Sequence, residues 1–338
     1  MRTKSRLLFV PICLGAMLLF VFVDCANKDS PPNPSAGVWE SIPSNSFLTR
    51  GGASASEVNG KIYIIGGFSN ETPNRDSTKF FCPIIQVFDA AANAWSTLKT
   101  SGAFTPRIGL STNVIENKIY AIGGFSETGV SSALEVFDPT TNSWSTPKTT
   151  GQFLPRGNHA TSVVNDKIYV MGGLNIDGKL INWVDMFDPM TSTWTTLQTK
   201  GEYLGGEYCD AIAIGSKIYL LGGHQRNVNF QRIQILDLEH LAWSDLAVRG
   251  KYRNRACFNA NLINGKIYAI GGGVRDQFPD VVDVFDPSTN TWTNPPHTGA
   301  FTGRLGLTCT TYNNKIYAFG GGANGKLLNT CEVFTPAK

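Results

Sequence analysis

Short runs of apolar residues, rich in β-branched and aromatic side chains, follow one another along most of the chain. One run recurs six times and reads lysine, isoleucine, tyrosine, two further apolar residues and two glycines, with its lysine at positions 61, 118, 167, 217, 266 and 315. These lysines are 57, 49, 50, 49 and 49 residues apart. A period near fifty indicates one supersecondary unit copied along the chain, whose apolar faces are buried against neighbouring copies.

Each unit predicts four short strands. In the second copy, residues 109–115 predict an inner strand, and residues 118–122 a second strand that ends at a glycine pair, where the backbone turns sharply or approaches a neighbour closely. Residues 134–138 alternate with period two as a third strand, and Asp-Pro then supplies a turn before the fourth. A tryptophan recurs in the fourth strand, and we expect each ring to pack between neighbouring sheets: Trp95, Trp144, Trp194, Trp243 and Trp292.

The two ends of the array complement each other. The last copy stops at residues 332–335 without a fourth strand, whereas residues 38–42, which include Trp39, stand alone before the first copy. We expect the N-terminal strand to complete the last blade, which closes the ring and hides the sheet edges. The glycine pair, the aromatic residue with Asp-Pro and the tryptophan resemble the kelch repeat over residues 37–335. This resemblance implies an all-β, six-bladed kelch-type β-propeller, and we assign it residues 37–338 as one domain.

The composition narrows the classes of function. Only 16% of the residues are charged and the formal net charge is +3, so no electrostatic argument favours nucleic acid. The sequence contains no P-loop, HExxH or nucleophile elbow, and its four histidines do not cluster. We therefore expect a monomer with no cofactor, no bound metal and no catalytic residue.

The N-terminus predicts export. Residues 1–24 combine a basic start with an apolar stretch, as a signal peptide does, and a retained anchor is the alternative. Cys25 and the polar, proline-rich residues 25–36 resemble the lipidation site and flexible tether of a bacterial lipoprotein. Asp24 and Phe22 depart from the usual pattern, so free secretion is the second interpretation. Both place the protein in the cell envelope, in the periplasm or on the outer surface, or outside the cell, with no membrane contact beyond the N-terminal anchor.

The remaining cysteines do not indicate a metal site or a disulfide framework. They are Cys82, Cys209, Cys257, Cys309 and Cys331, an odd number without CxxC spacing. We expect buried thiols. A bridge between Cys257 and Cys309, on adjacent inner strands, is the alternative that an exported protein would permit.

An arginine stands eleven residues before the repeated lysine in five of the six copies, with an aromatic residue three positions earlier: Arg50, Arg107, Arg156, Arg255 and Arg304. Because this segment enters the innermost strand, we expect the arginines to circle one mouth of the central channel, the usual binding face of the resembled family. The guanidinium groups could bind carboxylates or other anions there. Alternatively, each arginine donates to loop carbonyls or stacks on its aromatic neighbour and serves the repeat itself.

The fourth copy departs most from the repeat. Gly206 replaces the arginine, and Glu207, Tyr208 and Asp210 follow it; after the glycine pair comes a loop of long polar side chains that begins at His224. Departure from a repeat indicates a site when packing alone would have preserved the pattern. Drift at a variable surface loop is the other explanation.

Two further features could contribute to binding. The first copy contains an insertion of about eight residues within 69–83, and its Arg75, Lys79, Phe80 and Phe81 could anchor a partner or fold back as a lid. Trp183 lies outside the repeated tryptophan position and is either a contact for a sugar or protein, or local packing. We name Trp183, Phe230 and Phe278 as apolar contacts that flank the arginines.

The sequence therefore predicts a non-catalytic binding module whose arginine-rimmed face binds a protein, a peptide or another acidic ligand. The alternative is a sugar mutarotase or epimerase, similar to the periplasmic kelch-type sialic acid mutarotases. Arginine would then hold the carboxylate of an acidic carbohydrate while Glu207, Asp210 or His159 moves protons. Convergence of one carboxylate with the arginines in a closed pocket would favour the enzyme.

Overall fold

The computed structural model describes residues 36–71, 80–225, 228–229, 232–273 and 277–337. The expected signal peptide (residues 1–24), Cys25 and nearly all of the tether lie outside these residues, as do Arg75, Lys79 and Phe230. Every regular element of the described chain is a β-strand, and none of it forms a helix long and apolar enough to cross a bilayer. Pro34–Lys338 forms a compact unit.

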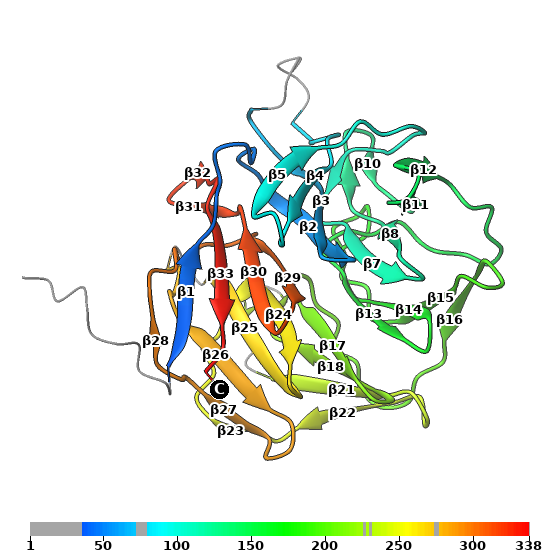
Figure 1. Ribbon diagram of the computed structural model, residues 1–338. Helices are drawn as coiled ribbons and strands as arrows, with labels where there is room; N and C mark the ends of the chain where they lie inside the picture. The colour runs from blue at the N-terminus through cyan, green and yellow to red at the C-terminus, as the bar shows by residue number, and fades with distance from the viewer. Residues whose placement is uncertain (1–35, 72–79, 226–227, 230–231, 274–276, 338) are drawn as a thin grey trace, which may run out of the picture. The chain divides into compact units, whose positions relative to one another are not determined.

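Six sheets of four principal strands follow the six copies of the repeat (Figure 1). The first three blades consist of β2 (Gly51–Val58), β3 (Lys61–Phe68), β4 (Gln86–Asp89) and β5 (Ala94–Thr97); β7 (Ser111–Ile115), β8 (Lys118–Ile122), β11 (Leu134–Asp138) and β12 (Ser143–Ser145); and β13 (Ala160–Val164), β14 (Lys167–Met171), β15 (Val184–Asp188) and β16 (Thr193–Leu197). The other three consist of β17 (Asp210–Ile214), β18 (Lys217–Leu221), β21 (Ile233–Asp237) and β22 (Ala242–Leu246); β24 (Ala256–Ile263), β25 (Lys266–Gly273), β26 (Val282–Asp286) and β27 (Thr291–Thr293); and β29 (Thr308–Tyr312), β30 (Lys315–Phe319), β33 (Cys331–Thr335) and β1 (Gly37–Ser41).

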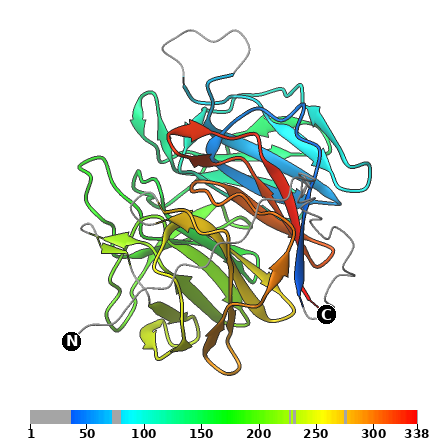
Figure 2. The same cartoon turned by 90° about the vertical axis from the view of Figure 1, so that its left-hand side faces the viewer.

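The N-terminal strand completes the last blade, as the sequence predicts. β1 pairs antiparallel with β33, with Trp39 opposite Phe334, and the two strands lie side by side in Figure 2. On its other edge β1 pairs parallel with β28 (His297–Thr298). The inner strands contact one another in chain order, and β29 of the sixth blade contacts β2 of the first. The ring of six blades is therefore closed, and the kelch-type propeller is confirmed.

The repeated glycine pair joins each blade to the next. Gly124 N–H donates to the carbonyl of Arg156 at 2.7 Å, and Gly321 N–H donates to that of Arg50 at 2.7 Å, from the sixth blade to the first. A Cβ at Gly123 would lie 2.5 Å from the same Arg156 carbonyl oxygen. Only glycine permits this approach of two backbones, so the pair is required by the contact between blades.

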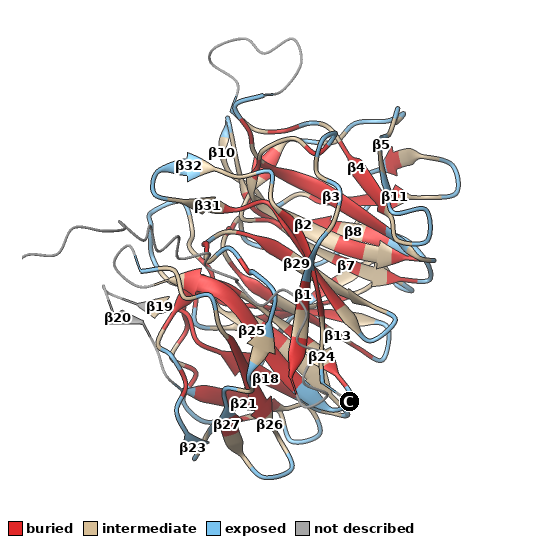
Figure 3. Cartoon of the chain, turned by 60° about the vertical axis from the view of Figure 1, so that its left-hand side comes forward, coloured by how far each residue is buried: buried red, intermediate tan, exposed pale blue. Residues whose placement is uncertain are grey.

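The tryptophans pack where the repeat predicts. Each of six rings stacks on the aromatic residue that precedes the arginine position of its own blade, with centroids 4.3 to 4.6 Å apart: Trp39 on Phe301, Trp95 on Phe47, Trp144 on Phe104, Trp194 on Phe153, Trp243 on Tyr203 and Trp292 on Tyr252. Trp39 thus supplies the sixth ring from the other end of the chain. Figure 3 shows the buried residues along the strands and the exposed residues in the turns. Stacked aromatic pairs contribute about 0.5–1.5 kcal/mol beyond the area they bury.

All inner strands begin at one face of the ring, which we call the mouth face. The second strands end there, so the loops between second and third strands also lie on it. Several of these loops form small hairpins: β9 (Phe125–Ser126) with β10 (Gly129–Val130), β19 (His224–Gln225) with β20 (Val228–Asn229), and β31 (Gly322–Ala323) with β32 (Lys326–Leu327). The mouth face therefore combines the entry of the channel with the most variable loops of the repeat.

Candidate functional site

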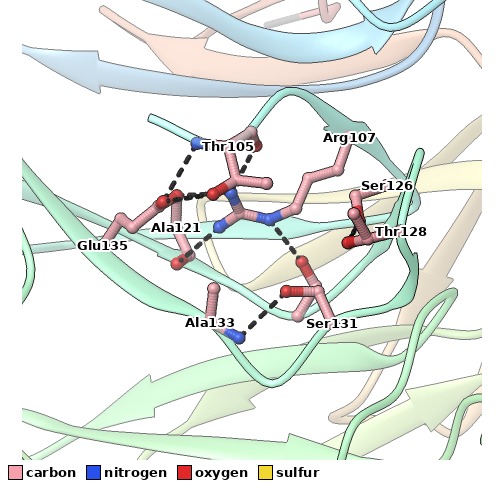
Figure 4. A network of polar contacts seen from close by, with 9 residues as sticks. Thr105, Arg107, Ala121, Ser126, Thr128, Ser131, Ala133 and Glu135 are labelled. Atoms are coloured by element: carbon pink, nitrogen blue, oxygen red, sulfur yellow. Dashed lines mark hydrogen bonds and ion pairs between the residues drawn. The ribbon is translucent and has the colours of Figure 1, made fainter. Parts of the chain in front are cut away.

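The arginines do not rim the mouth. Arg107 is fully buried within its blade, and its guanidinium donates to the carbonyls of Gly123 (2.6 Å), Thr105 (2.6 Å) and Ala121 (3.1 Å) (Figure 4). It also forms an ion pair with Glu135, whose other carboxylate oxygen accepts from Thr105 N–H at 3.0 Å. Burial lowers the pKa of Arg107, and Glu135 opposes that shift. These bonds engage the donors of the guanidinium inside the blade.

The other four arginines are equally buried, at 0–1% exposure. Their partners on the third strand or just before it are Asp185 for Arg156, Asp283 for Arg255, Glu332 for Arg304 and the side chain of Gln86 for Arg50. The guanidinium carbon of Arg156 lies 4.9 Å from the ring centroid of Phe153. The expected anion-binding rim is therefore wrong, and the alternative holds, because each arginine bonds carbonyls and packs on its aromatic neighbour.

Trp183 belongs to this internal network. Its indole N–H donates to Asp185 Oδ2 at 3.1 Å, and the guanidinium carbon of Arg156 lies 5.5 Å from its ring centroid. The tryptophan is partly buried and supports an ion pair, so local packing accounts for it. Phe278 lines a separate groove of about 790 Å³ together with the repeated Arg255 and with Lys251, Arg253 and Asn294. Each side chain therefore adjoins one repeated arginine, as expected, but that arginine is buried.

A ring of left-handed residues surrounds the channel at the mouth. Two positions after each arginine position, the chain has a positive φ of 56–65° at Gly52, Gly109, Asn158, Tyr208, Cys257 and Gly306. The N–H of one member donates to the carbonyl of the preceding one: Gly109 to Gly52 (3.3 Å), Asn158 to Gly109 (2.8 Å), Tyr208 to Asn158 (3.0 Å), Gly306 to Cys257 (3.1 Å) and Gly52 to Gly306 (2.9 Å). The equivalent link between Cys257 and Tyr208, both described residues, is not formed. This circle of backbone hydrogen bonds is therefore interrupted between the fourth and fifth blades.

Three members of this ring are not glycine, and they lie on consecutive blades. Asn158 adopts the left-handed conformation readily, whereas Tyr208 and Cys257 do so at a cost. Strained backbone of this kind gathers at functional sites. Sequence reasoning singled out Tyr208 and missed Asn158 and Cys257 as site residues, although glycine at the same position in the other three blades was the signal.

Glu207 and His224 meet at the mouth. Each blade pairs the residue after its arginine position with the residue after its glycine pair: Gly51 with Phe68, Ile108 with Phe125, Gly157 with Leu174, Glu207 with His224, Ala256 with Gly273 and Leu305 with Gly322. The fourth blade alone places ionisable side chains at this level of the ring. Glu207 Oε1 lies 3.5 Å from His224 Nδ1, and Asn158 Nδ2 donates to Glu207 Oε2 at 3.2 Å. The departure of the fourth blade from the repeat therefore creates a polar cluster across two blades.

A cavity of about 610 Å³ occupies the channel below this cluster, and all six inner strands line it. Its polar lining includes Asn158, Asp210 and Asn259, and its apolar lining includes Ile108 and Leu305. No lysine or arginine of the described chain belongs to the lining. The cavity is therefore unsuited to an anion that requires a charged partner.

Asp210 bridges two inner strands. Its Oδ2 accepts from Ala260 N–H of the next blade at 2.7 Å, and its Oδ1 accepts from Ala211 N–H at 2.8 Å. Burial raises the pKa of Asp210 to about 6, while these hydrogen bonds act in the opposite direction. Ser54 accepts from Thr112 N–H in the same way between the first two blades, so the position serves the contact between inner strands.

His159 is 7% exposed and belongs to the lining of the cavity. Its Nε2 lies 3.0 Å from Ser111 Oγ, and burial lowers its pKa to about 3, with a further contribution from the positive charge of Arg156. It does not approach a second histidine in a metal-binding group. The one such group among the described residues consists of Asp237, Glu239 and His240, in the exposed turn after β21, where Asp237 Oδ1 already accepts from Glu239 N–H.

The five described cysteines are free thiols. Cys257 and Cys309 are not bridged, so the disulfide alternative is not supported. Burial raises the pKa of Cys257 to about 12 and that of Cys209 to about 12. Thiols with such values remain protonated and react slowly.

A family model matches most of the chain. The KLHDC2/KLHL20/DRC7 Kelch-repeats domain matches residues 33–209 and 208–338. The chain therefore belongs to the kelch-repeat family and is a kelch propeller. A stretch of 72 residues, 21% of this chain, is 32% identical to the protein tag-53 of Caenorhabditis elegans, and it spans only 5% of that protein's length.

Proposed function

We propose that this chain is a non-catalytic binding propeller that engages a protein partner at its mouth face. Kelch-repeat domains generally mediate protein–protein interaction, and this supports the general class of protein-binding domain for the chain. The fold alone does not choose a binding surface, because propellers host unrelated functions. The choice of surface rests on the distribution of exposed side chains and on the polar cluster at the mouth.

The observation that carries the proposal is the position of the exposed apolar side chains. Of the large apolar residues exposed in the described chain, five lie in segments on the mouth face, and Met190 lies in a turn at the opposite face; the five are Phe80, Leu154, Ile176, Tyr208 and Leu305. Phe80 stacks on Phe68, which itself lines the cavity. Exposed apolar side chains rimmed by polar ones are typical of protein interaction sites.

The sugar-processing alternative loses its support in this arrangement. That mechanism needed an arginine for the substrate carboxylate beside a carboxylate or histidine for proton transfer. The arginines are buried in ion pairs or bonded to carbonyls, and the cavity lining contains none of them. His159 and Asp210 both line the cavity, but each is engaged in a contact between inner strands, His159 with Ser111 and Asp210 with Ala260.

The proposal is tested by affinity capture with the full chain and two matched variants. Leu305→Asp places a charge on the mouth face, and Met190→Asp places the same charge on the opposite face. Each variant is first checked for folding by its thermal transition. We expect proteins captured by the wild type to be retained by Met190→Asp and lost by Leu305→Asp in quantitative mass spectrometry. Equal capture by both variants would contradict binding at the mouth face.

We also propose that the propeller is exported, with residues 1–24 as the signal peptide and Cys25 as a lipidated first residue. The support is the basic and apolar pattern of the N-terminus followed by a polar, proline-rich segment. Metabolic labelling with a fatty-acid analogue should mark the wild type and leave Cys25→Ser unlabelled. An unlabelled mature chain that begins after another residue would indicate free secretion instead.

A further inference from the structure

We propose that the mouth accepts a basic side chain, lysine or arginine, from a partner polypeptide, with its charged group against Glu207 and its stem against the apolar wall of the cavity. This inference rests on the proposed function and adds the chemistry of the partner. The arginine pattern of the sequence predicts an acidic ligand, whereas this proposal gives the partner a basic group.

The charges at the mouth carry the first step. Four of the repeated arginines are neutralised by buried carboxylates, and Arg50 lies buried among carbonyls of the first blade. Among the residues that the structure describes, the cavity lining has no lysine or arginine, and Asp210 belongs to it. Glu207 is not itself a lining residue, but it adjoins the lining residue Tyr208, and its 14% exposed side chain adds a second carboxylate beside the cavity. The two carboxylates therefore attract a cation to this entry. The described lining residues include no lysine or arginine that could pair with an anion.

The second step concerns the geometry of Glu207. Its Oε2 is held by the amide of Asn158 at 3.2 Å, and its side chain is 14% exposed. The 3.5 Å separation of Oε1 from His224 Nδ1 is longer than a normal hydrogen bond between nitrogen and oxygen, so this oxygen retains acceptor capacity. A partly buried, oriented carboxylate gives a stronger charge-assisted hydrogen bond than an exposed one.

The third step concerns the surroundings of the bound group. Tyr208 adjoins Glu207 in the sequence, lines the cavity and is 39% exposed, so its ring can contact a cation. Ile108 of the second blade, and Leu305 and Leu327 of the sixth blade, also line the cavity. Long basic side chains bury their aliphatic stems on apolar surface and keep the head near polar groups. The mouth offers both kinds of surface.

The test uses a random-sequence peptide library displayed on phage and selected on the full chain. Wild type is compared with Glu207→Gln and with Tyr208→Asn, which keeps a residue suited to positive φ. The control is Glu40→Gln, at an exposed position of β1. We expect wild type and Glu40→Gln to enrich peptides rich in lysine and arginine. We expect Glu207→Gln and Tyr208→Asn to lose this enrichment.

A second measurement uses wild-type protein alone. An enriched peptide and its analogue with methionine in place of the basic residue are compared by fluorescence anisotropy, and we expect about tenfold weaker binding or more for the analogue. Peptides that need Tyr208 but are neutral or acidic would overturn the basic ligand and leave the proposed function standing. A selection in which no peptide depends on Tyr208 or Glu207 would overturn both.

Discussion

Arg107 and Glu135 form an ion pair inside the second blade, with the arginine side chain fully buried and the glutamate side chain 6% exposed. The pair joins the entry of the inner strand to the third strand. A carboxylate or an amide occupies the same place in each of the five other blades. Breaking such a pair leaves an uncompensated buried charge. The repeated arginine therefore contributes to the stability of its blade.

We predict that Arg107→Ala lowers the free energy of unfolding by about 3–5 kcal/mol, because Glu135 remains buried without its cation. Arg107→Lys should recover only part of the loss, since lysine cannot donate to Gly123, Ala121 and Glu135 together. Urea titration measures both variants. The control is Arg249→Ala, an exposed position, at which we expect a change within about 0.5 kcal/mol. A similar small change for Arg107→Ala would contradict the structural role.

Trp144→Ala should cost about 3–5 kcal/mol of unfolding free energy, because the ring is 5% exposed and stacks on Phe104. Trp95 occupies the equivalent position but is less buried, so Trp95→Ala should cost less. Chemical denaturation compares the two. A loss below about 1 kcal/mol for Trp144→Ala is incompatible with its place between the blades.

Asp210→Asn should change how stability depends on pH. The raised pKa of Asp210, about 6, means that the folded protein binds this proton more tightly than the unfolded chain does. The group's contribution to stability is therefore greatest at low pH and declines as the pH rises from about 4 to about 6. Asparagine keeps an acceptor for Ala260 N–H and removes the ionisation.

Denaturation at pH 4.5 and pH 7.5 checks this prediction. We expect the stability of Asp210→Asn relative to wild type to be more favourable at pH 7.5 than at pH 4.5. Identical differences at the two pH values would show that Asp210 has an ordinary pKa in the folded protein.

Cys257→Val should be destabilising by about 1–3 kcal/mol, because a β-branched residue tolerates a φ of 56° poorly. Cys257→Asn should be better tolerated at the same position, since asparagine populates this region, as Asn158 does one step along the ring. Thermal melts of both variants give the comparison. Equal melting temperatures would argue against the left-handed ring at this blade.

The polar cluster at the mouth illustrates the limit of the repeat pattern. Glu207 and His224 stand out in the sequence because their blade departs from the other five, but the two lie seventeen residues apart and nothing local brings them together. Asn158 joins them from the preceding blade. The signal for Asn158 and Cys257 was present as the loss of glycine at a repeated position, and it becomes meaningful only once the backbone there is known to be left-handed.

The sequence by itself determined the number of blades, their strand order and the closure by residues 38–42, because strand periodicity, turn residues and copied motifs are local and repeat six times. Tertiary structure decided which polar groups reach the ligand face. The direction of an arginine depends on a partner about thirty residues away, which is glutamate, aspartate or glutamine in different blades. Because that partner is buried, the guanidinium group is buried with it. Glu207, Tyr208 and apolar side chains then lie at the mouth.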